Sequence, residues 1–235
     1  MSTNLFFSKK GPFPLSDITK IIGCKDDISI NPNALAYILF TSGSTGVPKG
    51  IPINFYNLQS LIDALMIYFP DNINSVLQAF EFSFDVSIAC TFFAWEKGAC
   101  LHSVKLSGII PLNTYKILTE NNTEFVTLPP SSAIFMDKFN ILDKGPVNIL
   151  HTIFTGEALA YNVVNKWKKF GSNSHIYNAY GPTENTVWSF IYKCNEYTEN
   201  ELINGLVPIG EIKKKQRILS LKETTKFDIS LEIGL

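Results

Sequence analysis

Cysteine and histidine are scarce in this chain of 235 residues, which contains four cysteines and three histidines. No two cysteines have the Cys-x-x-Cys spacing of a zinc site or a redox pair, and this count excludes a disulfide scaffold. Cys90 and Cys100 lie in apolar surroundings, so we expect reduced and mostly buried thiols, as in a cytoplasmic protein. His102, His151 and His175 are isolated in the sequence, and we predict packing positions for them instead of a metal site.

Long apolar runs and an excess of either charge are also missing. No apolar run approaches the roughly 20 residues that span a bilayer, and no basic region followed by an apolar stretch marks a signal peptide. The formal net charge is −1, which gives no general attraction to nucleic acid or an anionic membrane. Hydrophobic residues make up 46% of the chain, which is ample for a packed core. We therefore expect a soluble intracellular protein.

Segments with strand and helix patterns alternate along most of the chain. Asn54 can cap a helix, and further helix-like segments lie at residues 84–95, 115–121, from 131 onward and at 160–170. Strand-like segments lie at residues 35–40, 75–80, 99–104, 124–128, 148–154 and 175–178. This alternation predicts an α/β fold with a mostly parallel, doubly wound sheet and flanking helices.

The pattern changes near both ends. Residues 1–33 read as a lead-in segment, and residues 34–190 as the α/β core. Residues 191–235 are predicted to begin a short β-rich C-terminal part, because strand patterns at 187–192, 216–222 and 227–233 have no long helices between them. The basic residues at 213–217 are interpreted as a solvated strand edge.

Residues 41–50 (TSGSTGVPKG) form the most informative stretch. An apolar run at 35–40, interpreted as a buried strand, leads into hydroxyl residues, glycines and Lys49. Glycines let backbone N–H groups approach a ligand, and such groups together with a lysine suit a polyphosphate. The spacing is not that of the common P-loop. The alternative is a flexible Ser/Gly turn between a strand and a helix.

A second stretch, residues 178–184 (NAYGPTE), follows a strand at the expected carboxyl edge of the sheet, where open α/β sheets bind ligands. Its aromatic ring can stack on a purine, its amide can read an exocyclic amine and its hydroxyl can reach a phosphate. Its carboxylate can hold Mg²⁺. The alternative is a Gly-Pro turn with incidental polar neighbours.

Residues 35–50 and 178–184 resemble the signatures of adenylate-forming enzymes, especially amino-acid adenylation domains of nonribosomal peptide synthetases and D-alanine–carrier-protein ligases. The resemblance implies catalytic roles for Lys49, Thr183 and Glu184, with Glu184 binding Mg²⁺. It further implies that Asn178 contacts adenine and Tyr180 stacks on it. Nucleotide binding is implied for Thr41, Ser42, Gly43, Ser44, Thr45, Gly46, Lys49, Gly156, Glu157, Asn178, Ala179, Tyr180, Gly181 and Thr183.

Residues 84–87 (FDVS) are a weaker match. In amino-acid-activating members of this family an aspartate here holds the substrate ammonium group, which implies that role for Asp85. The family's pocket then falls on Val86, Ala89, Thr127, Ile153, Thr155, Ala179, Val187 and Trp188. These residues are mostly small or apolar with one large ring, so we predict a small uncharged amino acid. The alternative for Asp85 is a structural aspartate at a helix N-terminus.

The implied reaction uses ATP and Mg²⁺ to convert the amino acid to an acyl-adenylate, which is then passed to a carrier-protein thiol. The resemblance covers about residues 30–212, and the family's ribose-binding aspartate and C-terminal lysine lobe have no match. We therefore expect binding to survive better than turnover. Two alternatives stay open: a non-catalytic ATP- or adenylate-binding fragment, and a fatty-acyl or aryl-acid ligase that needs no aspartate for an ammonium.

Overall fold

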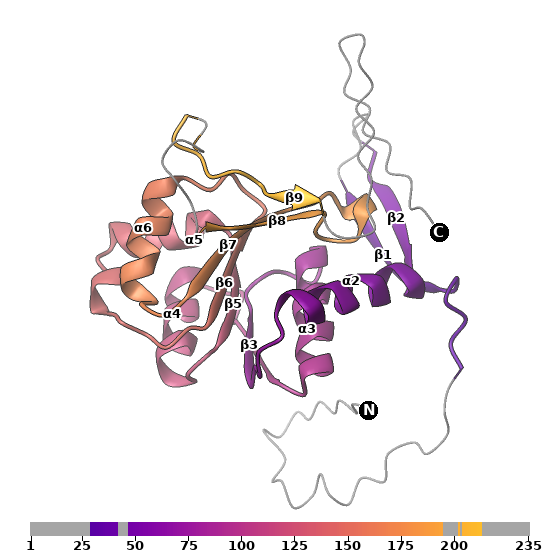
Figure 1. The fold of residues 1–235 in the computed structure, drawn as a ribbon, viewed down its shortest axis with the longest axis horizontal. Coiled ribbons are helices and arrows are strands. Elements are labelled where there is room, and N and C mark those ends of the chain that lie inside the picture. Colours follow the sequence, from indigo (N-terminus) through magenta and orange to yellow (C-terminus); the bar gives the residue numbers. More distant parts are fainter. Residues whose placement is uncertain (1–28, 42–46, 195–201, 203, 213–235) are drawn as a thin grey trace, which may run out of the picture.

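The computed structural model describes residues 29–41, 47–194, 202 and 204–212, and its centre is a seven-stranded sheet (Figure 1). The strand order is β4-β3-β5-β6-β7-β8-β9. These strands are β3 (Ser75–Gln78), β4 (Cys100–Ser103), β5 (Phe125–Leu128), β6 (His151–Thr155), β7 (His175–Tyr180), β8 (Phe190–Lys193) and β9 (Glu211–Ile212). The pairs from β4 to β7 are parallel, whereas β8 and β9 are added antiparallel. The predicted α/β class with a mostly parallel sheet is confirmed.

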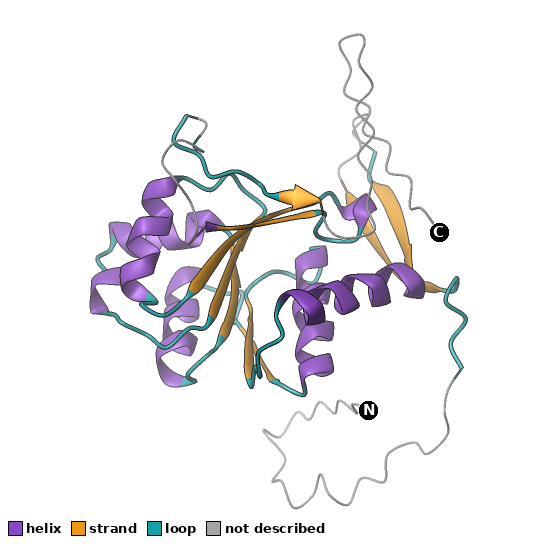
Figure 2. Cartoon of the chain, in the orientation of Figure 1, coloured by secondary structure: helices purple, strands orange, loops and turns teal. Residues whose placement is uncertain are grey.

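Five helices cover the two faces of this sheet (Figure 2). They are α2 (Phe55–Tyr68), α3 (Asp85–Lys97), α4 (Ile110–Glu120), α5 (Pro130–Lys138) and α6 (Tyr161–Phe170), with short 3₁₀ turns η1 (Leu142–Lys144) and η2 (Thr183–Asn185). Buried residues of α2 and α3 pack in one hydrophobic cluster, and those of α4, α5 and α6 in another. Neighbouring residues of one strand, such as Val76 and Leu77, enter opposite clusters because side chains alternate along a strand. The sheet is therefore doubly wound.

The strand order reverses at β3, which has β4 on one side and β5 on the other. The chain leaves β3 through α3 on one face and returns from β4 through α4 on the opposite face. Open α/β sheets bind ligands outside the carboxyl ends of their strands at such a point. The first residue of α3, Asp85, follows β3 there.

A separate two-stranded sheet carries the Gly- and Ser-rich stretch. Strand β1 (Leu35–Thr41) pairs antiparallel with β2 (Lys49–Asn54), so the stretch joins two strands and does not lead into a helix. Strand β1 was predicted to be buried, and this is wrong: Ile38 is 48% exposed and Phe40 is 70% exposed. Strand β1 is only partly covered: α2 contacts it, and Ala36 and Tyr37 pack against the cluster of α2 and α3.

Several helix boundaries follow from local chemistry. The Asn54 side chain accepts a hydrogen bond of 2.8 Å from the Asn57 N–H and caps α2, as predicted, and Gly98 ends α3 with φ of 65°. Helix α4 begins before the predicted residue 115, because Pro111 suits its first turn. Helix α5 begins at Pro130 and not at Ser131, for the same reason.

The C-terminal part is described only as far as residue 212. The strand predicted at 187–192 is shorter and later, since β8 begins at Phe190 after a turn in which Thr186 and Val187 have positive φ. The strands predicted at 216–222 and 227–233 and the basic residues 213–217 lie outside the described residues. The domain boundaries stay predictions. Among the described helices, none is long and apolar enough to cross a membrane.

Candidate functional site

Asp85 is the central group of the site. It is the first residue of α3, only 8% of its surface is exposed, and its Oδ2 atom has no hydrogen-bond partner among the described residues. Burial raises the pKa of the Asp85 carboxyl group, while hydrogen bonds from Thr183 and from backbone N–H groups of the helix start act in the opposite direction. The negative charge of Glu184 adds a smaller upward effect. Asp85 is thus a buried acceptor with one oxygen still unbonded.

The turn that follows β7 brings the second motif to Asp85. Strand β7 ends at Tyr180, whose ring is 49% exposed, and η2 then places Thr183 next to the Asp85 carboxylate. Gly181 has no room for a side chain, because a Cβ atom would lie 2.4 Å from the Val187 carbonyl oxygen. Turn η2 also contacts β2, the strand that begins with Lys49. The two sequence motifs therefore meet at the carboxyl end of the sheet.

The residues predicted to line a substrate pocket are brought together beside Asp85. Six of them belong to one buried cluster: Val86, Ala89, Ile153, Ala179, Val187 and Trp188. The Trp188 indole N–H donates a hydrogen bond of 3.0 Å to Thr155 Oγ1, which fixes the ring at the end of β6. Thr127 is fully buried and lies against the Cys90 thiol. These side chains are buried and mostly short, with the Trp188 ring as the one large group.

Two predicted nucleotide-binding residues already have structural partners. The Asn178 amide donates to the Val207 and Pro208 carbonyl oxygens at 3.1 and 2.9 Å, which leaves only its Oδ1 for a ligand. The Glu157 carboxylate accepts from the Ser131 N–H and hydroxyl, both at 2.8 Å, and so holds the start of α5. Their roles toward a nucleotide stay predictions.

The remaining predicted positions lie around the same edge. Ala179 is buried in β7, Gly156 follows β6 with φ of 86° and open space beside it, and the exposed Lys49 pairs with Thr41 across the hairpin. Ser42, Gly43, Ser44, Thr45 and Gly46 lie outside the described residues.

The sequence reasoning missed Tyr37 of β1. Its ring packs against the cluster that contains Val86 and Trp188, and its hydroxyl is buried without a hydrogen-bond partner in the described part of the chain. Burial and the negative charge of Asp85 both raise the pKa of the Tyr37 phenol. The apolar pattern of residues 35–40 signalled a strand but could not show that this tyrosine faces Asp85.

Other polar groups are organised away from this site. His151 Nε2 lies 2.9 Å from Asp71 Oδ2 at the amino end of β6, and no group of three or more metal-ligating side chains occurs in the described ranges.

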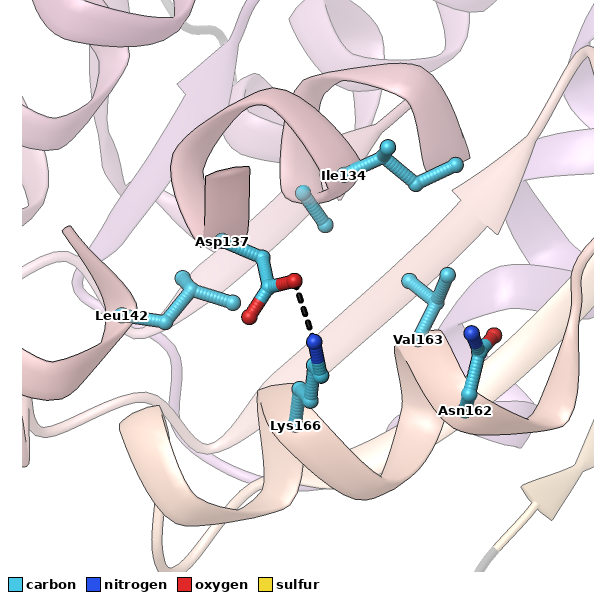
Figure 3. Close-up of a pocket in the computed structure, with 7 residues that line it drawn as sticks. Ile134, Asp137, Leu142, Asn162, Val163 and Lys166 are labelled. Carbon is cyan, nitrogen blue, oxygen red and sulfur yellow. Dashed lines mark hydrogen bonds and ion pairs between the residues drawn. The ribbon is translucent and has the colours of Figure 1, made fainter. Parts of the chain in front are cut away.

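Cys90 and Cys194 are buried and unpaired, whereas Cys100 is exposed, contrary to its predicted burial, because β4 is an edge strand. Figure 3 shows a small surface cavity of about 60 Å³ between α5 and α6, with Asp137 paired to Lys166. It lies on the opposite face of the sheet from Asp85.

Residues 8–214 match the family model described as "AMP-binding enzyme". Among curated relatives, the nonribosomal peptide synthetase SIDC of Beauveria bassiana is 30% identical over 162 residues, which is 68% of this chain and 3% of the synthetase. The D-alanine–D-alanyl carrier protein ligase of Bacillus licheniformis is 32% identical over 194 residues, which is 81% of this chain. This chain spans only 38% of that ligase.

A solved structure shows the same fold. The adenylation domain AlmE of Vibrio cholerae, crystallised with glycyl-adenosine-5'-phosphate, superposes with a TM-score of 0.71 over 85% of this chain and 36% of that domain's chain. Its identity to this chain is 24%, so this likeness establishes the architecture and nothing more specific.

Proposed function

Because the chain belongs to the AMP-binding enzyme family, we propose that it binds ATP and a small amino acid and activates the amino acid as an acyl-adenylate. The observation that carries the proposal is the buried Asp85 carboxylate beside Thr183 and Glu184, at the carboxyl end of the sheet. A buried carboxylate with an unbonded oxygen favours a cationic donor, and the ammonium group of an amino acid is such a donor.

The packing around Asp85 supports a small, uncharged side chain. Val86, Ala89 and Val187 contribute short apolar groups, and the fixed Trp188 ring closes the space beside them. A charged substrate side chain would find no partner charge in this cluster, and burying an unpaired charge is costly. Alanine, serine and valine therefore fit better than large or charged amino acids. These contacts favour neither the L- nor the D-form of the amino acid, so the experiment below compares both.

ATP fits the edge formed by the two motifs. The exposed Tyr180 ring offers a stacking surface for adenine, and Asn178 Oδ1 can accept from an exocyclic amine. Lys49 at the start of β2 offers a positive charge to the phosphates, and η2 lies against that strand. Each of these roles is proposed from position and chemistry.

The oxygen groups of η2 suit Mg²⁺. Glu184 is an exposed carboxylate, and Mg²⁺ is commonly held by one or two carboxylates together with substrate phosphates. When bound, the ion would neutralise phosphate charge. Glu184 is the described residue that would hold it, with Thr183 positioned toward the same phosphates.

In the proposed reaction, a carboxylate oxygen of the amino acid forms a bond to the α-phosphorus of ATP, and the bond to the β-phosphate breaks. Pyrophosphate leaves with the bonding electrons, and the acyl-adenylate stays bound. The protein acts by positioning: Asp85 anchors the amino acid, while Lys49 and Thr183 stabilise charge on the phosphates. The sulfur of a carrier-protein thiol, after losing its proton, then bonds to the acyl carbon, the acyl–phosphate bond breaks and AMP leaves; the name of the Bacillus licheniformis relative indicates a carrier-protein acceptor for that protein.

The test is amino-acid-dependent exchange of labelled pyrophosphate into ATP. A panel of small L- and D-amino acids is compared with phenylalanine and glutamate, and Lys49→Ala controls for contaminating activity. We expect exchange with one small amino acid and a loss of at least tenfold in Lys49→Ala, since charge stabilisation of phosphates is lost. Preference for phenylalanine or glutamate would contradict the pocket assignment.

A second candidate is a protein that binds ATP or an adenylate without turnover. The described groups of the site, Asp85, Thr183 and Lys49, would act by binding and positioning ligands, which suits holding an adenylate as well as forming one. Calorimetry with a non-hydrolysable acyl-adenylate mimic separates the two. Binding without exchange supports the second candidate, whereas the absence of both overturns both functions.

A further inference from the structure

Two buried oxygen atoms, Tyr37 Oη and Asp85 Oδ2, have no hydrogen bond among the described residues, and Tyr37 packs against the cluster that contains Val86, the residue after Asp85. They come from different elements: Tyr37 belongs to strand β1, and Asp85 is the first residue of helix α3. Burial raises the pKa of the Tyr37 phenol, and the negative charge of Asp85 raises it further. Leaving a buried polar group unbonded is unfavourable, and more so for a charged group.

The backbone is irregular at this tyrosine. The pairing of β1 with β2 shifts register between Leu35 and Tyr37, where Leu35 faces Asn54 and Tyr37 faces Ile53. As a result Ala36 and Tyr37, although neighbours, both pack against the cluster of α2 and α3. Irregularities of this kind re-aim a side chain next to functional sites. In this protein the Tyr37 ring packs against the cluster that contains Val86, and its hydroxyl is buried there instead of reaching the solvent.

The two groups do not satisfy each other. A tyrosine hydroxyl can donate to a carboxylate, yet no such bond is formed in the described structure. A donor placed between them, with several N–H groups, would bond to both oxygens at once. An ammonium group has three such N–H groups and carries the positive charge that a buried carboxylate lacks.

Resting on the function proposed above, we propose that Tyr37 is a specificity-determining residue that shares the substrate ammonium with Asp85. Its hydroxyl accepts one N–H of the ammonium, and Asp85 Oδ2 accepts another. Thr183, which bonds to the Asp85 carboxylate, holds that carboxylate in place from the side of η2. Tyr37 therefore helps to select a primary amine over a substrate that carries only the carboxylate.

The experiment compares two ligands that differ only in the amine: a non-hydrolysable alanyl-adenylate mimic and the same mimic with a propionyl group. Calorimetry gives the ratio of the two affinities for each protein, and this ratio is insensitive to a general loss of folded protein. For Tyr37→Phe, which removes only the hydroxyl, we expect the preference for the amine to fall about tenfold. Binding of the propionyl mimic should stay unchanged.

Tyr115→Phe is the matched control, because Tyr115 is a half-buried tyrosine of α4 that packs on the opposite face of the sheet. It should keep the wild-type ratio. An unchanged ratio in Tyr37→Phe would overturn this inference alone. If wild type binds neither mimic, the proposed function fails together with it; if wild type binds both equally, the assignment of the ammonium to Asp85 and Tyr37 fails while nucleotide binding stands.

Discussion

At the scale of single residues, Asp85 combines a proposed function with a cost to stability. Its carboxylate is buried, one oxygen is unbonded and Glu184 adds a nearby negative charge. The pKa of Asp85 is therefore raised in the folded protein, which means that folding disfavours the charged form at neutral pH. Groups of this kind are typical of sites where activity and stability conflict.

We predict that Asp85→Asn is more stable than wild type by about 1 kcal/mol at pH 7, because a neutral amide replaces a buried charge. The same variant should lose at least tenfold in affinity for an amino acid. Urea unfolding measures the first effect and calorimetry the second. Destabilisation with unchanged binding would instead support the structural helix-start role of Asp85. Unchanged binding would also favour the fatty-acyl or aryl-acid alternative.

His151 predicts a dependence of stability on pH. Burial lowers the pKa of this imidazole, although its contact with Asp71 acts in the opposite direction. A histidine whose folded-state pKa lies below its unfolded value binds fewer protons when folded, so stability is lost as the pH falls below about 6.5. We expect the unfolding free energy to decrease between pH 7.5 and 5.5.

His151→Gln should reduce this decrease but not abolish it, because burial also lowers the pKa of His102. Urea unfolding of wild type and His151→Gln at both pH values gives the comparison. An unchanged pH dependence in His151→Gln would contradict the assignment.

At the scale of elements, the turn after β7 depends on Gly181 for space. A Cβ atom there would lie 2.4 Å from the Val187 carbonyl oxygen and 2.7 Å from the Ser189 nitrogen, and backbone cannot yield as a flexible side chain can. Gly181→Ala should therefore destabilise the protein by about 3 kcal/mol and displace η2. Gly98 ends α3 at positive φ with nothing near it, so Gly98→Ala should cost only about 1–2 kcal/mol.

Thermal unfolding and adenylate-mimic binding check this contrast. Both variants lower stability, but only Gly181→Ala should also weaken binding, because only that turn carries Thr183 and Glu184. Equal effects on binding would show that η2 is not held by Gly181.

Elements with local signals were predictable from the sequence, and those that depend on distant partners were not. Asn54 and Gly98 mark helix ends through their own chemistry. The exposure of β1 depends on which elements cover the hairpin, and no pattern within residues 35–40 carries that information. The start of α4 was missed because Pro111 was not recognised as a first-turn residue.

At the scale of the whole molecule, alternation of strands and helices was enough to predict the doubly wound sheet, while the site that the motifs predict at its carboxyl edge stays a prediction. The sequence could not place Tyr37, because its packing against the cluster beside Asp85 depends on how β1 pairs with β2 and on which elements cover that hairpin. Nor could it show that the Asn178 amide is occupied by carbonyl groups of residues 207–208, which lie 29 and 30 positions further on.

The whole fold should respond to the nucleotide even if turnover is slow. A ligand that binds only the folded state stabilises it by RT ln(1 + [L]/Kd), which is about 2.7 kcal/mol at a hundredfold excess over Kd. We predict that saturating ATP with Mg²⁺ raises the unfolding free energy by an amount of this order, because the proposed nucleotide site joins β2 of the hairpin and η2, which contact each other. In Lys49→Ala, the ATP concentration that gives the same stabilisation should be at least tenfold higher, since the positive charge proposed to face the phosphates is removed. Urea unfolding at increasing ATP concentration measures both. Stabilisation in wild type without pyrophosphate exchange would separate binding from catalysis in this chain, whereas no stabilisation at any ATP concentration would contradict a nucleotide site built from β2 and the turn after β7.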